Sequence, residues 1–222
     1  MLLPLLAASD WGIAIGIGVI LLLFLVVGYV IIQGTRVQLY WRKQAEGGNV
    51  EAIRTLVGDE VTRWKTARTP KDVAPAVWHG VQSAELLDVW PDGVRLSASA
   101  EGQYALVGNE RREVSSLLKE ALKLTARLGE MVMYDVPNVK LAHAEIDVYS
   151  TYRDQEGSSQ RCIMSTDCRR EVADQLDWDG LDAEDIVHAF GGRYSLDDRG
   201  NPLPVAIEER TSGVPAAFYK DD

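Results

Sequence analysis

A chain of 222 residues with 46% hydrophobic and 25% charged residues can bury a core, which excludes a wholly disordered protein. Its formal net charge of −10 at pH 7 repels phosphate backbones, and the sequence contains no basic stripe that could release counterions from DNA or RNA. We therefore expect no nucleic-acid partner.

The strongest signal is an uncharged apolar stretch near the N-terminus, since there is no Asp, Glu, Lys or Arg from Trp11 to Thr35. As a helix, the apolar part of this stretch would be about 33 Å long, which matches the hydrocarbon core of a bilayer. Trp11 lies at one end and Tyr40 with Trp41 beyond the other, where aromatic side chains favour the membrane interfaces. These features predict a single-pass transmembrane helix in a lipid bilayer.

The flanks of this stretch predict its processing and its orientation. Residues 1–10 contain no basic residue, and the apolar run before Ala7 is too short for a secretory signal peptide, so we expect an uncleaved helix. Arg36, Arg42 and Lys43 follow the stretch, and the positive-inside rule then places the N-terminus outside the cell membrane and the C-terminal domain in the cytoplasm. The reversed topology is the alternative, because the rule has exceptions for short uncharged tails.

Small residues recur within the apolar stretch at the spacing of one helical face. Gly12 with Gly16, and Ala14 with Gly18, form two pairs four residues apart. Such pairs let the backbone of a second membrane helix approach closely, which predicts packing against another integral-membrane subunit or a second copy. The alternative is that these glycines reflect only the general frequency of Gly in membrane helices.

An amphipathic helix is predicted next, from about Val50 to Ala67, with Asn49 as its cap and Pro70 beyond its end. Its polar face mixes both charge signs, which favours packing on the domain over binding to lipid. The apolar residues at helical spacing are Ile53, Leu56, Val57, Val61 and Trp64.

Two strands are predicted over residues 78–89 and 94–107, joined by a Pro- and Gly-containing turn at 90–93. The second strand alternates apolar and polar residues, which indicates one buried and one solvated face. A polar turn is expected at 108–113. The two strands should form an antiparallel hairpin.

A helix from Ser115 or Ser116 to about Met133 follows, and then a second strand pair over 139–152 and 160–168. The resulting order is ββαββ, an α+β domain in which a helix covers one face of an antiparallel sheet. A short helix is expected over 182–190.

The predicted organisation has four parts, of which the last is an extended tail that either lies along its own domain or docks on a partner. They are an N-terminal tail and transmembrane helix (1–35), a basic juxtamembrane segment with the amphipathic helix (36–70), an α+β cytoplasmic domain (71–200) and the C-terminal tail (201–222).

The cysteines are predicted to be free thiols. Cys162 and Cys168 should lie on one face of the same strand about 20 Å apart, which is beyond disulfide geometry. Free thiols fit a reducing compartment, in agreement with the cytoplasmic assignment.

No residue pattern predicts a catalytic, cofactor or metal site. His79, His143 and His188 stand singly, without the spacing that presents two imidazoles to a metal. The acidic run from Asp177 to Asp185 lacks a calcium-loop pattern, and Asp182 is better explained as a helix cap. A cysteine nucleophile beside a histidine would need the fold to bring the two together.

Two functions of different classes are compatible with these features. The favoured hypothesis is a non-catalytic accessory or scaffold subunit of an integral-membrane complex, which needs no cofactor. The alternative is a membrane-anchored enzyme or small-ligand-binding module whose site assembles from residues far apart in the sequence.

Overall fold

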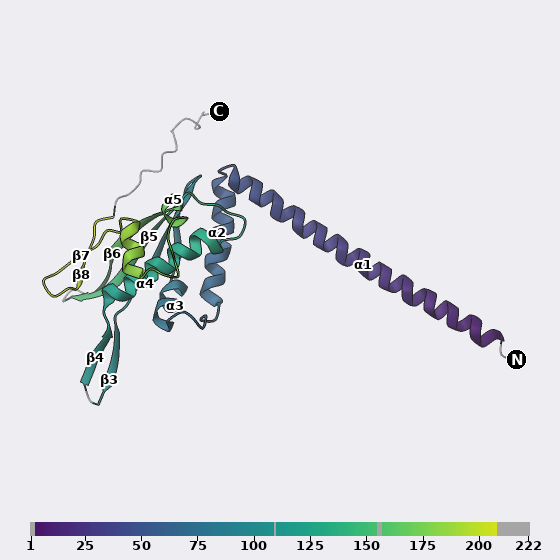
Figure 1. Cartoon of the computed structure of the whole chain (residues 1–222), viewed down its shortest axis with the longest axis horizontal. Coiled ribbons are helices and arrows are strands. Elements are labelled where there is room, and N and C mark those ends of the chain that lie inside the picture. The colour runs from purple at the N-terminus through teal and green to yellow at the C-terminus, as the bar shows by residue number, and fades with distance from the viewer. Residues whose placement is uncertain (1–2, 109, 155–156, 208–222) are drawn as a thin grey trace. The chain divides into compact units, whose positions relative to one another are not determined.

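The computed structural model describes residues 3–108, 110–154 and 157–207, and the chain divides into two compact units, Met1–Gln44 and Ala45–Asp222. The first unit consists of α1, a helix from Leu3 to Glu46 that continues into the start of the second unit (Figure 1). Most of its described apolar side chains are exposed, for example Phe24 at 72% and Leu25 at 71%. Within the described part of the chain, no helix combines the length and the apolar character needed to cross a membrane.

The predicted helix-packing and interface residues are only partly described. The side chains of Trp11, Ala14 and Arg36 and the surroundings of Gly12 lie outside the described residues. A Cβ atom added at Gly16 or Gly18 would meet no other atom within 4 Å. Tyr40 and Trp41 are adjacent, with ring centroids 5.9 Å apart, and Arg42 and Lys43 are exposed.

The second unit begins with the predicted amphipathic helix, α2, at Val50–Thr66. The Asn49 side chain caps it by accepting hydrogen bonds from the backbone N–H groups of Glu51 and Ala52, both at 3.1 Å. Its apolar side is buried in the core of the domain, as the mixed charges of its polar face predict.

A four-stranded sheet forms the centre of this unit, in the order β1-β2-β5-β6. The strands are β1 (Glu85–Val89), β2 (Gly93–Ser99), β5 (His143–Asp154) and β6 (Gly157–Arg169). β1 pairs with β2 and β5 with β6 in antiparallel fashion, but β2 and β5 are parallel. The sheet is therefore mixed, and the prediction of a purely antiparallel sheet is wrong. The helix between β2 and β5 returns the chain to the end of the sheet where β2 began, so β5 runs in the same direction as β2.

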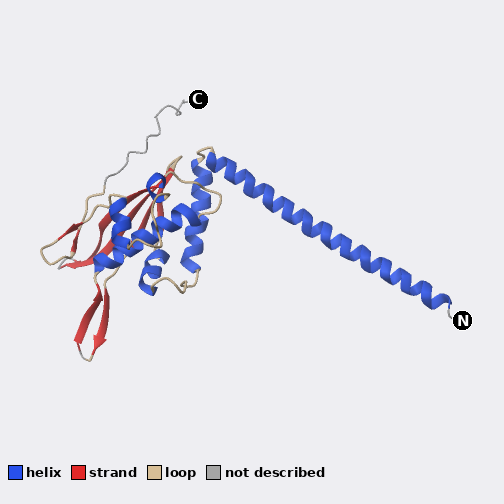
Figure 2. Ribbon diagram, in the orientation of Figure 1, coloured by secondary structure: helices blue, strands red, loops and turns tan. Residues whose placement is uncertain are grey.

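The helices cover one face of the sheet (Figure 2). They are α3 (Pro75–Gln82), α4 (Leu117–Glu130, continued by a π-helical turn at Met131–Asp135), α5 (Arg170–Ala173) and α6 (Ala183–Ala189). Their apolar side chains form one core with the alternating apolar residues of β2 and β5, such as Leu96 and Ile146. A small pair of strands, β7 (Ser195–Leu196) and β8 (Pro202–Leu203), follows α6.

The first predicted strand pair differs from the structure at two places. Residues 75–82 form α3 because Pro75 is favourable at the first turn of a helix, and Trp78 and Val81 then lie three residues apart on one buried side. The predicted strand 94–107 is divided, since β2 ends at Ser99 and β3 (Gln103–Val107) leaves the sheet. The predicted polar turn is mostly strand β4 (Glu110–Ser115), which pairs with β3.

Candidate functional site

The sheet face opposite the helices carries a buried cluster of charges. Arg95 on β2 lies directly across from Glu145 on the parallel strand β5, and Asp147 is two residues further along β5 on the same face. Arg95 Nε donates to Asp147 Oδ2 at 2.7 Å, and its Nη2 lies 4.0 Å from Glu145 Oε1. All three side chains are buried. The Arg95 guanidinium thus lies within ion-pair distance of two buried carboxylates.

The electrostatic environment stabilises the charge on Arg95. Burial alone would lower its pKa, but the hydrogen bond and the charge of Asp147, with the charge of Glu145, raise the pKa above its ordinary value. The second carboxylate oxygen of Asp147, Oδ1, is buried and has no hydrogen-bond partner among the described residues. The ion pair with Arg95 therefore offsets part of the free-energy cost of burying the Asp147 carboxylate.

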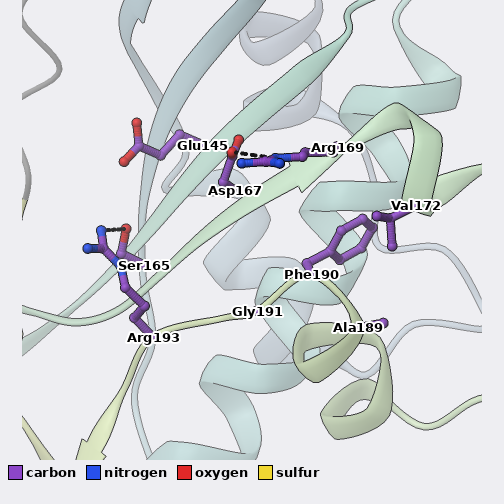
Figure 3. Close-up of a pocket in the computed structure, with 9 residues that line it drawn as sticks. All are labelled: Glu145, Ser165, Asp167, Arg169, Val172, Ala189, Phe190, Gly191 and Arg193. Carbon is purple, nitrogen blue, oxygen red and sulfur yellow. Dashed lines mark hydrogen bonds and ion pairs between the residues drawn. The ribbon is translucent and has the colours of Figure 1, made fainter.

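A cavity of about 540 Å³ opens beside this cluster, between β6 and the segment after α6 (Figure 3). Four of its lining side chains are charged, namely Glu145, Asp167, Arg169 and Arg193. Arg169 Nε lies 3.2 Å from Asp167 Oδ2, and Arg193 Nη2 lies 3.5 Å from Ser165 Oγ. Phe190, Val172 and Ala189 form an apolar side of the cavity.

Local backbone geometry places Arg193 at the cavity. Gly191 closes α6 in the left-handed region, with φ +68, where glycine is favoured. A Cβ atom at position 192 would collide with the Val187 side chain. Only glycine therefore lets the backbone lie this close to α6. Arg193 then forms two backbone hydrogen bonds with Ser165 on β6, at 2.8 and 3.0 Å.

The hairpin formed by β3 and β4 is a second candidate site, because it projects from the rest of its domain (Figure 1). Its apolar side chains are exposed, with Leu106 at 78%, Val114 at 66%, Val107 at 53% and Tyr104 at 52%. The guanidinium of Arg111 lies 4.1 Å from the centre of the Tyr104 ring. A two-stranded hairpin without a buried face is marginally stable alone, so a surface of this kind is typical of a contact with a partner.

Comparisons with known proteins give no further guide to either site. The chain matches no protein-family model, no curated protein and no solved structure.

The three histidines considered as possible metal ligands lie on different elements of the fold. His79, His143 and His188 lie on α3, β5 and α6, and among the described residues no group of three or more His, Cys, Asp or Glu side chains is placed to hold a metal ion. Asp182 caps α6 by accepting from the N–H groups of Glu184 and Asp185, which confirms the capping interpretation.

The two cysteines occupy different faces of β6, so the prediction that they share a face is wrong. Cys162 pairs with Tyr149, on the face of the charge cluster, and Cys168 pairs with Ala144, on the core face. A bulge in the pairing of β5 and β6 lies between them and shifts the alternation by one residue. Both thiols are free, as predicted, and both are buried.

We expect neither thiol to react with Ellman's reagent in the folded protein. Burial and the charge of Asp147 raise the pKa of Cys162 to about 11, and burial also raises the pKa of Cys168. Since only the thiolate is nucleophilic, the raised pKa values and the burial both keep these thiols unreactive at pH 8. Absorbance should rise only after unfolding in urea. Stoichiometric release of the chromophore before unfolding would contradict the buried placement.

Sequence reasoning missed both candidate sites, although partial signals are present. Arg95 lies on the predicted solvated face of its strand, and Glu145 and Asp147 alternate with apolar residues on β5. That alternation indicates that the acids share one face of β5, but the pairing of β2 with β5 is what brings Arg95 to them.

Proposed function

We propose that the chain is a non-catalytic, single-pass membrane-anchored accessory or scaffold subunit of an integral-membrane protein complex. The uncharged stretch from Trp11 to Thr35 supports the anchor, with Trp11 on one side and Tyr40 and Trp41 on the other. The basic residues Arg36, Arg42 and Lys43 follow it and none precedes it, which supports an N-terminus outside and a cytoplasmic domain.

The observation that carries the proposed contact role is the exposed apolar surface of the β3–β4 hairpin. Tyr104 and Leu106 alternate with Ala105 and Val107, and β3 contains no charged residue. Charged residues occupy most of β4, where they discourage the addition of another strand. An extended segment of a partner subunit can pair along the outer edge of β3, with apolar side chains beside Tyr104 and Leu106.

A second contact is proposed within the bilayer. Gly12 with Gly16 and Ala14 with Gly18 provide two smooth strips on the helix where a neighbouring membrane helix can approach. The space beside Gly16 and Gly18 is open, because a Cβ atom at either position would have no neighbour within 4 Å, and a second helix could approach there. Both strips lie towards the N-terminal half of the uncharged stretch, so this contact is separate from the hairpin.

Purification of the full chain from its native membranes in a mild detergent tests this function. We expect the chain to migrate on a native gel well above its own 24.5 kDa, together with at least one other integral-membrane protein that mass spectrometry identifies. Extraction of the membranes with alkaline carbonate should leave the chain in the pellet. Release by carbonate, or migration without a membrane partner, would contradict the proposal.

A further inference from the structure

We propose that the cavity between β6 and the segment after α6 binds a neutral polyhydroxylated ligand, a monosaccharide or cyclic polyol. This role is independent of the hairpin contact, because the cavity is lined by residues of β5 and β6, by Val172 and by the segment from Ala189 to Arg193. Its volume of about 540 Å³ suits a small molecule.

The charges around the cavity favour a ligand without charged groups, because each carboxylate of the lining already has a guanidinium near it. The carboxylates of Glu145 and Asp167 and the guanidinium groups of Arg169 and Arg193 give the lining as many positive as negative charges. Asp167 already has Arg169 beside it, and Glu145 lies near Arg95. An anion or a cation would meet both attraction and repulsion there. A hydroxyl group suits both kinds of side chain, since it donates to a carboxylate and accepts from a guanidinium.

The polar groups are held in place before a ligand arrives. Glu145 and Ser165 are buried at 5% and 2% exposure and lie on neighbouring strands of the sheet. The backbone of Arg193 is fixed by two hydrogen bonds to Ser165, and its guanidinium Nη2 lies 3.5 Å from Ser165 Oγ. Because these groups lose little freedom on binding, several modest hydrogen bonds can add up to useful affinity.

The aromatic side chain of Phe190 gives the cavity a surface on which a sugar ring can pack. Phe190 lies on the side of the cavity away from Glu145 and Arg193, next to Val172 (Figure 3). Its ring also contacts Trp178, with ring centroids 5.9 Å apart and the planes tilted by 42°. The C–H groups on one face of a pyranose or cyclitol can pack on such a ring while its hydroxyls reach the charged side.

Saturation-transfer NMR on the full chain in a polyoxyethylene detergent tests the proposal, because glycoside detergents would themselves offer sugar. The probes are D-glucose, D-galactose, D-mannose and myo-inositol, with glycine as a zwitterion and inorganic phosphate as an anion. We expect at least one neutral probe to bind and neither ionic probe to do so. Asp167→Ala and Arg193→Met should each weaken that binding about tenfold or more.

The matched control is Arg54→Met, which removes an exposed arginine on α2 and should leave binding unchanged. Circular dichroism establishes which of the two cavity variants folds, and either one suffices for the comparison. The proposal is overturned if none of the four neutral probes binds, if glycine or phosphate binds in their place, or if binding survives in a folded cavity variant.

Discussion

Replacing Arg95 by Met should destabilise the folded domain by about 3–5 kcal/mol, since it leaves the fully buried carboxylate of Asp147 without the guanidinium that pairs with it. Asp147 Oδ2 would lose its 2.7 Å hydrogen bond, and Oδ1 already has no partner among the described residues. Met retains the length and apolar bulk of the Arg95 stem, so loss of packing contributes little. Urea unfolding followed by tryptophan fluorescence, which reports on buried Trp64 and Trp78, measures the change.

An exposed arginine on the same domain provides the control. Arg112 pairs with Glu110 at 3.3 Å, but their side chains are 65% and 75% exposed. Arg112→Met should therefore change the free energy of unfolding by less than about 1 kcal/mol. If the two substitutions changed the free energy of unfolding equally, burial of the Arg95 cluster would not be the cause of the destabilisation.

Removing the whole cluster should restore much of the lost stability. The triple variant Arg95→Met, Glu145→Met, Asp147→Leu replaces three buried charges by apolar side chains of similar size, and such replacements are commonly neutral or stabilising. A triple variant less stable than Arg95→Met alone would mean that the carboxylates have stabilising contacts apart from Arg95.

Local capping and turn chemistry made several elements predictable. Asn49 and Asp182 both cap the helices that follow them, because their side chains satisfy backbone N–H groups without help from distant residues. The turn between β1 and β2 was predicted for the same reason, and Trp90 N–H indeed donates to Gly93 O at 2.8 Å.

Features that depend on distant pairing were not predictable. The parallel pairing of β2 with β5 follows from the path of the chain through α4, which no short pattern encodes. The predicted strand 94–107 includes β3, but β4 was missed because its run of charged residues resembles a turn. The bulge in the β5–β6 ladder reversed the expected orientation of Cys162 without a glycine or proline in β6 after Gly157 to mark it.

The candidate sites were hidden for the same reason. Arg95 and Asp147 are 52 residues apart, and only the β2–β5 register makes them neighbours. Arg193 reaches Ser165 across 28 residues through the tight passage at Gly192. Such convergence is a property of the fold, whereas capping residues and apolar periodicity are properties of short segments.

Replacing Leu106 by Lys should release the partner subunit from the complex. Leu106 is 78% exposed, so the substitution removes no core contact and should leave the fold intact. In an interface, loss of its buried apolar area costs about 1.5–3 kcal/mol, and a lysine placed there adds the cost of desolvating a charge. Together these effects correspond to at least about a tenfold loss of affinity.

Leu196→Lys is the matched control, because Leu196 is also an exposed leucine, at 42%, but lies on β7 outside the hairpin. The decisive measurement compares the membrane proteins that co-purify with the wild-type chain, Leu106→Lys and Leu196→Lys at equal amounts of folded chain. We predict that the partner is lost from Leu106→Lys and retained by wild type and Leu196→Lys. Retention of the partner by Leu106→Lys at the wild-type level would contradict the account.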